Sequence, residues 1–431
     1  MLGAFVNAFR TPDLRRKLLF VLFILVLFRL GSTVPAPGVN VANVRASVES
    51  VEGNSLFTLI NLFSGGALLQ LTVFALGIMP YITASIILQL LTVVIPRLET
   101  LKKEGQSGQT KITQYTRYAT LGLAVLQATG IVALARSGQL FGTTTGRSLL
   151  YNEDSIFSFV LIVITMTAGT AIIMWFGELI TDRGIGNGMS ILIFTQVVAT
   201  FPGTLWQIKV AQGWFTFAIV VAVGLAVVAA VIFVEQAQRR IPVQYARRMV
   251  GRRMFGGSST YIPLKVNQAG IIPVIFASSL MYLPALASQF NPSAGWAAWV
   301  NEVFVRGDHP LYMLTFFALI VFFTYFYVSI TFNPTEVADN MKKYGGFIPG
   351  IRAGRPTEEY LAYVLSRITA PGATYLGIVS LIPLIAIALV DANQNFPFGG
   401  TTILIMVGVG LDTVKQIESQ LQQRNYEGFL R

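Results

Sequence analysis

Apolar stretches about as long as a membrane is thick recur from one end of this chain to the other, and they constrain the fold more than any other feature. A straight helix needs ~20 predominantly apolar residues, within a range of about 17–25, to cross the hydrocarbon core of a bilayer. The chain has 431 residues, of which 54% are hydrophobic and 12% are charged, whereas soluble proteins carry roughly 25% charged residues. The stretches lack the short alternating pattern of a transmembrane β-barrel. The sequence therefore predicts an all-α polytopic membrane protein.

We interpret the apolar stretches as ten transmembrane helices. They are predicted at residues 18–36, 79–95, 116–135, 156–177, 188–205, 214–234, 270–287, 311–331, 371–390 and 399–414. Basic residues precede the first stretch, as they do in a signal peptide, but Pro35-Ala36-Pro37-Gly38 follows it in place of a small-x-small cleavage site. We therefore expect the first stretch to be retained as a span.

The distribution of Lys and Arg orients the predicted spans. If the N-terminus lies in the cytoplasm, the termini and loops on that side hold 25 of the 31 Lys and Arg residues. Cytoplasmic loops of membrane proteins carry an excess of these two residue types. We therefore place the N-terminus in the cytoplasm, and ten spans bring the C-terminus back to the same side.

The ten spans divide into an N-terminal half, residues 1–205, and a C-terminal half, residues 206–431. Five spans in each half would make the halves face opposite ways, as in proteins with inverted repeats, although no residue-level repeat is visible. Two predicted cytoplasmic loops, at about 235–269 and 332–370, are long. Loops of this length are usually functional, so we expect a docking surface there. The alternative is that their positive charge serves only to set the topology.

The segment from Gly53 to Pro96 predicts an irregular feature at membrane depth. Residues 55–71 are apolar but short, and Ser64-Gly65-Gly66 interrupts them, while a separate helix is expected from Pro80 onward. Non-helical backbone at membrane depth is tolerated only where protein buries it or where it lines a water-filled cavity. The interior of the protein at membrane depth is therefore predicted to contain a water-filled cavity.

Several kinds of chemistry are excluded by the residues present. The chain has no cysteine and a single histidine, His309, so a His/Cys zinc site is not expected. The glycine-rich stretch GQSGQTK, from Gly105 to Lys111, lacks the spacing of a P-loop, and no H-E-x-x-H motif occurs. We assign no catalytic residue, metal or cofactor, and we expect that the protein is not an enzyme.

Ionisable residues are nearly absent from the interior of the predicted spans; Glu178, Asp182 and Glu235 lie at span ends. A charge at the bilayer centre costs roughly 2.5–3.5 kcal/mol on insertion scales and usually belongs to an ion pathway or a proton relay. Ion coupling is therefore disfavoured, and energy for transport would come from a partner. One possible function is that of a secondary transporter with an inverted repeat. Another is that of a membrane-anchored docking platform without a pore.

Apolar residues on four predicted spans are candidates to line a narrow passage. Ile82 and Ile86 are four residues apart and share one helix face, as do Met189 and Ile193. Ile275 follows Pro273, and Ile405 follows Gly399-Gly400. Taken singly, each is only an apolar residue in a membrane helix.

Five motifs, in this order along the chain, resemble the SecY family of bacterial protein-translocation channels. They are GGALLQLTVFALGIMPYITASIILQLLTVV, RGIGNGMSILIF, KVNQAGIIPVIFASS, GGFIPGIRAGRPTEEYL and FGGTTILIMVGVGLD. The resemblance implies an hourglass pore through a bundle of ten helices in the plasma membrane. It also implies a passive channel that passes unfolded preproteins across the bilayer and releases hydrophobic segments sideways into it.

The resemblance implies that the waist of the pore is a ring of six apolar side chains, Ile82, Ile86, Met189, Ile193, Ile275 and Ile405. The family usually has isoleucine at the position of Met189, but methionine is flexible and adaptable. Branched apolar side chains in a narrow neck expel water and block ions. They also offer no hydrogen bond to a passing polypeptide.

Two moving parts are implied by the same resemblance. The first is a plug at about residues 55–71, which includes Asn61, Leu62, Phe63, Ser64, Gly65 and Gly66. The second is a lateral gate between the second and third spans and the seventh and eighth, with Ser85, Gln127, Ser278 and Ser279 on its seam. Hydrogen bonds across such a seam would be worth about 0.6–2 kcal/mol each, weak enough for a signal helix to compete.

The partners that the resemblance implies are SecE and SecG in the membrane, with the SecA motor or the ribosome at the cytoplasmic face. Signal sequences and unfolded polypeptides are the implied substrates. Basic loops suit ribosomal RNA, because binding to phosphates is electrostatic. The candidate partner-binding residues are Arg247, Arg248, Arg252, Arg253 and Arg352.

Overall fold

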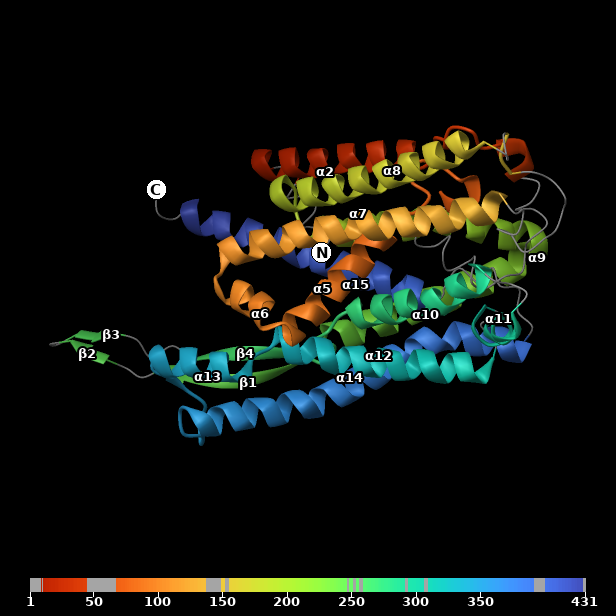
Figure 1. The fold of residues 1–431 in the computed structure, drawn as a ribbon. Coiled ribbons are helices and arrows are strands. Elements are labelled where there is room, and N and C mark those ends of the chain that lie inside the picture. Colours follow the sequence, from red (N-terminus) through yellow and green to blue (C-terminus); the bar gives the residue numbers. More distant parts are fainter. Residues whose placement is uncertain are drawn as a thin grey trace.

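The structure is a computed structural model, and it is mostly helical. It describes residues 9, 11–44, 67–136, 149–151, 155–245, 248–250, 253–255, 259–290, 294–305, 309–390 and 400–428. Most of the long helices run roughly side by side, and a small β-sheet with a projecting hairpin lies at one end of the bundle (Figure 1).

In the first part of the chain, three helices begin at or next to a proline. The elements of this part are α2 (Pro12–Gly31), the 3₁₀ turn η1 (Leu68–Gln70), α5 (Met79–Val94), α6 (Pro96–Lys103), α7 (Gln106–Arg136) and α8 (Ile156–Arg183). Helices α5 and α6 are bent by 99° at Ile95. The residue before a proline avoids the helical region, and Ile95 is accordingly extended, with φ −98° and ψ 111°.

The second part of the chain opens with one long helix, α9 (Gly188–Gln236), which is broken at Gly213. Gly213 has φ 82° and ψ 178°, a conformation open chiefly to glycine. The remaining helical elements are α10 (Ile272–Phe290), α11 (Gly295–Val300), the π-helical turn η2 (Asn301–Val305), α12 (Pro310–Thr331), α13 (Pro334–Lys343), α14 (Arg355–Val390) and α15 (Gly400–Gly428). His309 caps α12, since its Nδ1 accepts the N–H of Leu311 at 3.1 Å.

Each of the ten predicted spans overlaps one of these helices, with the fifth and sixth both in α9. Within the described residues, three helices are long and apolar enough to cross a membrane by themselves: Ile156–Arg183, Gly213–Gln236 and Pro310–Lys343. The bent pair α5 and α6 together would make a fourth. The structure thus contains several apolar helices, and the full set of ten spans stays a prediction.

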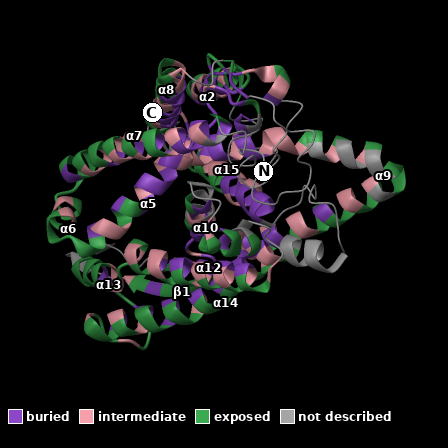
Figure 2. Cartoon of the chain, turned by 45° about the vertical axis from the view of Figure 1, so that its right-hand side comes forward, coloured by how far each residue is buried: buried purple, intermediate pink, exposed green. Residues whose placement is uncertain are grey.

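The largest hydrophobic core lies where the inner faces of the helices meet, and Figure 2 shows buried residues concentrated toward the middle of the bundle. Large apolar side chains also cover the outside. Phe157, Phe215 and Phe233 are each at least 76% exposed. Isolated exposed apolar residues are normal on soluble proteins, but so many large ones on long helices indicate contact with another apolar phase. Acyl chains of a bilayer provide that phase.

The two long loops that the sequence predicts to be cytoplasmic join in one three-stranded antiparallel sheet of order β4-β1-β5. Its strands are β1 (Gln238–Tyr245), β4 (Ser259–Lys265) and β5 (Gly346–Phe347), and a separate hairpin pairs β2 (Arg248–Val250) with β3 (Arg253–Phe255). A small core of its own supports the sheet: Ile241, Val243, Leu264, Met341, Ile348, Leu361 and Val364. The sequence predicts these segments only as loops, and the sheet corrects the all-α expectation.

Helix α8 is held closely by its neighbours. Arg117 of α7 donates two hydrogen bonds to the Glu178 carboxylate of α8, from Nε at 2.7 Å and from Nη2 at 2.8 Å. Farther along α8, Gly169 lies against the carbonyl oxygen of Val73, and a Cβ at this position would collide with that oxygen. The backbone can approach α8 here only because residue 169 has no side chain.

We predict that Gly169→Ala lowers the thermal stability of the purified protein. Overpacking costs about 1–3 kcal/mol, which exceeds the roughly 0.5–1 kcal/mol that alanine gains over glycine inside a helix. Gly122→Ala on α7 is the matched control, because open space surrounds that position. The melting temperature in detergent measures both variants. An unchanged or raised melting temperature for Gly169→Ala would contradict the close approach of Val73.

Candidate functional site

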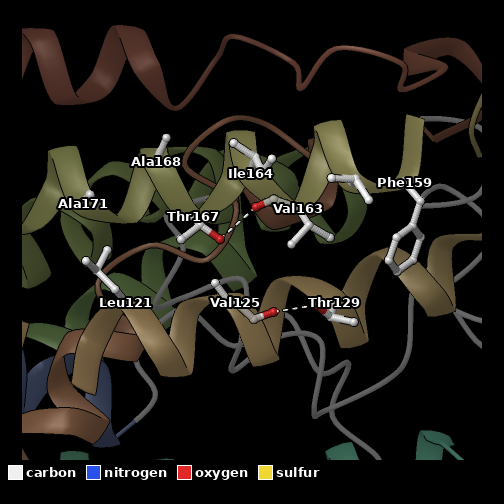
Figure 3. Close-up of a pocket in the computed structure, with 10 residues that line it drawn as sticks. Leu121, Val125, Thr129, Phe159, Val163, Ile164, Thr167, Ala168 and Ala171 are labelled. Carbon is white, nitrogen blue, oxygen red and sulfur yellow. Dashed lines mark hydrogen bonds between the residues drawn. The ribbon is translucent and has the colours of Figure 1, made fainter. Parts of the chain in front are cut away.

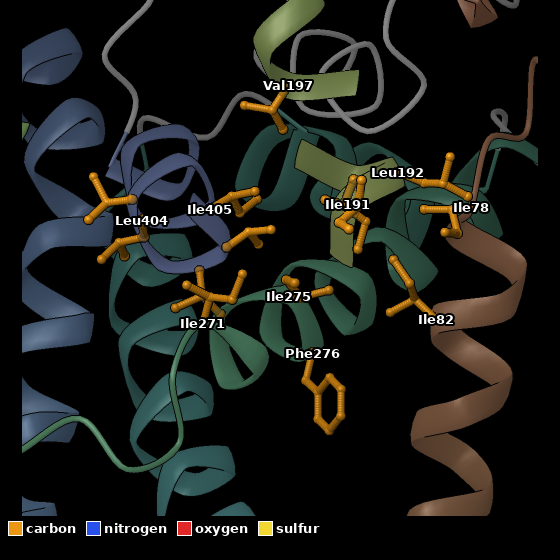
Figure 4. Packing of buried hydrophobic residues seen from close by; sticks show 14 of the residues in the cluster. Ile78, Ile82, Ile191, Leu192, Val197, Ile271, Ile275, Phe276, Leu404 and Ile405 are labelled. Atoms are coloured by element: carbon orange, nitrogen blue, oxygen red, sulfur yellow. The ribbon is translucent and has the colours of Figure 1, made fainter. Parts of the chain in front are cut away.

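Five of the six side chains predicted to form a ring lie in one buried hydrophobic cluster. Ile82 and Ile86 come from α5, Ile193 from α9, Ile275 from α10 and Ile405 from α15, and all five are buried. Residues from four helices that are far apart in the sequence therefore share one buried cluster. Figure 4 shows Ile82, Ile275 and Ile405 approaching the same region from three different helices.

Met189, the sixth ring candidate, differs from the five isoleucines. It is half-buried and packs against the edge of the same cluster. Its sulfur lies against Gly177 of α8, where a Cβ would collide with it. A flexible thioether can fill such a gap beside a glycine. Met189 thus contacts α8 as well as the cluster.

A tight turn between α8 and α9 sets the position of Met189 and Ile193. Asn187 caps α9, because its Oδ1 accepts the N–H of Met189 at 3.0 Å and that of Ser190 at 3.4 Å. The Gly188 N–H donates to Thr181 Oγ1 of α8 at 2.9 Å. These bonds hold the first turn of α9 against α8 and so determine which face of α9 enters the cluster.

The predicted plug residues Asn61, Leu62, Phe63, Ser64, Gly65 and Gly66 lie outside the described residues. The segment that follows them is well anchored. Leu71 adopts a left-handed conformation at φ 47°, and its carbonyl accepts the N–H of Ala36 at 3.0 Å. Val73 donates to the carbonyl of Val34 at 3.0 Å. The chain therefore enters α5 from a fixed point beside the loop that follows α2.

The four predicted gate residues lie on helices that contact one another, because α10 touches both α5 and α7. Ser85 of α5 and Gln127 of α7 are half-buried. The hydroxyls of Ser278 and Ser279 donate to the carbonyls of Val274 and Ile275 in their own helix. Serine in a helix often bonds the carbonyl four residues earlier, so these two bonds differ from the cross-helix bonds that the sequence analysis expected.

Three of the five predicted docking arginines, Arg248, Arg253 and Arg352, lie at the sheet end of the molecule. Arg248 is in β2 and Arg253 is in β3, in the hairpin that projects from the bundle (Figure 1), whereas Arg247 and Arg252 lie outside the described residues. Arg352 is exposed, and the carbonyl of this residue accepts the hydroxyl of Thr357 at 2.9 Å. Its side chain is therefore presented to solvent on an ordered turn.

An apolar groove of about 530 Å³ that the sequence did not predict lies between α7 and α8. Leu121, Val125, Phe159 and Val163 are among its lining residues (Figure 3). The hydroxyls of Thr129 and Thr167 donate to carbonyls of their own helices, at 2.7 and 2.8 Å. The groove therefore presents a hydrocarbon-like surface.

A buried polar pair, Glu235 and Asn267, also escaped the sequence analysis, which placed Glu235 at a span end facing the cytoplasm. Glu235 is buried, and Asn267 Nδ2 donates to its Oε1 at 2.6 Å. The one feature of the sequence that could have indicated this pair is the motif KVNQAG, whose asparagine precedes an apolar run. Among the described residues, no group of three or more His, Cys, Asp or Glu could hold a metal ion.

Comparison with known proteins supports one family over the whole length of the chain. A sequence model of the SecY family matches residues 72–414. The chain is 67% identical over 437 aligned residues to the protein translocase subunit SecY of Streptomyces galbus, with both chains fully covered. It is 59% identical over 444 aligned residues to the subunit of the same name from Mycobacterium bovis, again with full coverage of both.

Solved structures share the fold at low sequence identity. A protein-conducting channel matches with a TM-score of 0.62 at 19% identity, covering 93% of this chain and 91% of the other. Canine Sec61, solved in a ribosome-channel complex from the endoplasmic reticulum, matches with a TM-score of 0.59 at 18% identity, with the same coverage. The family match, the close relatives and the shared fold agree, and the chain belongs to the SecY family.

Proposed function

We propose that this chain forms a passive protein-conducting channel in the plasma membrane, which passes unfolded preproteins across and releases hydrophobic segments sideways. The observation that supports the proposal is that one buried cluster contains Ile82, Ile86, Ile193, Ile275 and Ile405, which four helices contribute. The Streptomyces relative is a protein translocase subunit, and one structure of the same fold is a protein-conducting channel.

The proposed architecture is an hourglass of ten membrane-spanning helices in two inverted halves, residues 1–205 and 206–431, with both termini in the cytoplasm. The break at Gly213 supports a division near this boundary, because it separates the two parts of α9. The strands of the two long loops lie at the same end of the bundle, as the proposed orientation requires.

The proposed seal depends on the chemistry of the ring, Ile82, Ile86, Met189, Ile193, Ile275 and Ile405. Apolar side chains at a constriction exclude water, and ions cannot pass where they would lose their hydration. An unfolded polypeptide can displace these side chains, which form no hydrogen bond with it. The plug, at about residues 55–71, would cover the outer side of the ring at rest. In another SecY protein of the same fold, the plug domain stabilises the closed state of the channel and maintains a membrane seal.

The proposed lateral gate lies where α10 contacts α5 and α7. Ser278 and Ser279 bond within α10, and Ser85 and Gln127 are half-buried on the facing helices. Apolar packing then supplies most of the contact across this seam. A hydrophobic signal helix offers the same kind of contact, so it can replace one side of the seam at small cost in free energy.

Partner proteins would supply the force that drives a polypeptide through the proposed channel and would determine which polypeptides reach it. We propose that SecE and SecG bind in the membrane, and that the SecA motor or the ribosome binds the sheet and hairpin at the cytoplasmic end. Arg247, Arg248, Arg252, Arg253 and Arg352 would contact these partners. Basic residues bind RNA phosphates through a salt-dependent electrostatic interaction. Two structures of this fold, canine Sec61 and yeast Ssh1, were solved with ribosomes.

We predict that deleting the plug and changing the six ring residues to glycine raises the ion conductance of the resting channel in planar bilayers by about tenfold or more. The matched control carries the same plug deletion with glycine at Ile87 and Ile378, two exposed isoleucines. The control should conduct no more than the plug deletion alone. Equal conductance of the two variants would place the constriction elsewhere.

We predict that a preprotein stalled during transport forms cross-links with Ile86→Cys and Ile275→Cys. The chain has no native cysteine, so each introduced thiol is unique. Ile378→Cys, on the exposed face of α14, is the control and should not react. A docking platform without a pore predicts the opposite outcome, in which neither buried position contacts the stalled chain.

We predict that Arg352→Ala lowers the rate of motor-driven translocation about tenfold, which corresponds to ~1.4 kcal/mol. The resting conductance should not change, because Arg352 is exposed at the sheet end, away from the ring. Arg355→Ala is the matched control, since Arg355 is also exposed and pairs with Glu359 at 3.2 Å. Equal rates for the two variants would exclude a specific role for Arg352.

A further inference from the structure

The buried pair Glu235 and Asn267 joins the end of one helix to the start of another. Glu235 lies in the last turn of α9, and Asn267 lies between β4 and α10. Asn267 is 2% exposed, and its Nδ2 donates to Glu235 Oε1 at 2.6 Å and to the carbonyl of Gly270 at 3.1 Å. One amide group therefore connects α9 to the turn that begins α10.

The same pair closes the base of the three-stranded sheet. Directly beside it, the Val266 N–H donates to the Ala237 carbonyl at 3.0 Å, and the ladder between β1 and β4 then runs from Gln238↔Lys265 to Gln244↔Ser259. Strand β5, from the second long loop, pairs with the far end of β1. One continuous sheet therefore joins both loops to residues 235–237 and 265–267.

From this base, the path to the ring is short. Gly270 has φ 62°, and the N–H groups of Val274 and Ile275 bond the carbonyl of Ile271 at 3.1 and 3.3 Å in the first turn of α10. Ile271 and Ile275 both belong to the large buried cluster. On the other side, Gly372 of α14 lies so close to the Val266 carbonyl that a Cβ there would collide with it. The junction is therefore packed against α14 on one side and bonded to the turn that begins α10 on the other.

The hydrogen bonding of the pair favours a positioning role over a purely stabilising one. Both N–H donors of the Asn267 amide are used at this junction, while its Oδ1 is buried without a partner among the described residues. The hydroxyl of Tyr375, on α14, is buried without a partner there too. Unsatisfied buried polar atoms are costly, and replacing both partners of such a pair by apolar groups can be neutral or stabilising. Polar groups retained at such a cost often serve function.

We propose that Glu235 and Asn267 are positioning residues that fix the sheet β4-β1-β5 relative to α10, so that a partner pulling on the long loops moves Ile275 in the ring. The functional part of this inference rests on the proposed channel function. The positional part does not, because it concerns only the angle between the sheet and one helix.

Spin labels test the positional part without any transport. Thr260→Cys on β4 and Leu280→Cys on α10 are exposed sites in a chain without native cysteine. In lipid nanodiscs the distance distribution should be narrow in the parent and in Glu235→Gln, whose amide oxygen can still accept from Asn267. In Glu235→Ala it should widen about twofold, because the junction opens locally. If Glu235→Ala does not accumulate, Asn267→Leu takes its place with the same expectation.

Translocation kinetics test the functional part. Glu235→Ala should lower the maximal motor-driven rate about fivefold, at the lower end of typical coupling strengths. The motor concentration for half-maximal rate should stay within about twofold of the parent, because the docking residues are untouched. Glu235→Gln should restore the rate. Glu359→Gln, an exposed carboxylate that pairs with Arg355, is the matched control and should match the parent.

The outcomes distinguish the positioning role of Glu235 and Asn267 from the proposed channel function. A narrow distance distribution in Glu235→Ala, or a wide one in Glu235→Gln, would overturn the positioning role. A parallel loss of motor affinity and rate would also overturn it, since that indicates general damage to the docking surface. If the parent itself conducts no protein while the spin-label result holds, the proposed channel function fails and the positional inference stands.

Discussion

The structure depends on one constraint: in lipid, no water can satisfy a backbone N–H or C=O group, so these groups must bond within the chain. Long helices meet that requirement and leave only side chains to decide how they pack. The inner faces are apolar and meet in one large cluster, while the outer faces carry exposed rings such as Phe233. The proposed passage through this bundle needs a lining of side chains that give way, and the isoleucines that four helices contribute to the cluster suit that role.

The sheet end of the molecule follows a different rule, because its exposed polar side chains require water. Strands can form there, and β1 pairs with β4 on one side and with β5 on the other, although β5 lies about a hundred residues away in the sequence. The sheet turns two separate loops into one body with its own core. Its base meets α10 at Asn267, so the surface that would receive a partner and the helix that carries Ile275 are connected by hydrogen bonds.

Much of the fold and part of the site could be predicted from residues alone. Proline indicated the start of α5, and helical spacing placed Ile82 and Ile86 on one face. The contacts of Met189 with Gly177, the bonds of Ser278 and Ser279 within α10 and the burial of Glu235 could not be predicted. The contact of Met189 and the burial of Glu235 depend on neighbours that are distant in the sequence. The serine hydroxyls can bond a carbonyl of their own helix or a group on another helix, and only the packing decides between these acceptors.

The sequence by itself determined the class of the protein, most of its helices and its family, because hydropathy and motif order are properties of the linear chain. Only the tertiary structure decided that five isoleucines from four helices share one cluster and that two loops share one sheet. The physical reason is that burial and strand pairing are relations between segments. A residue's type permits such a contact, but the packing of the other helices determines whether it forms.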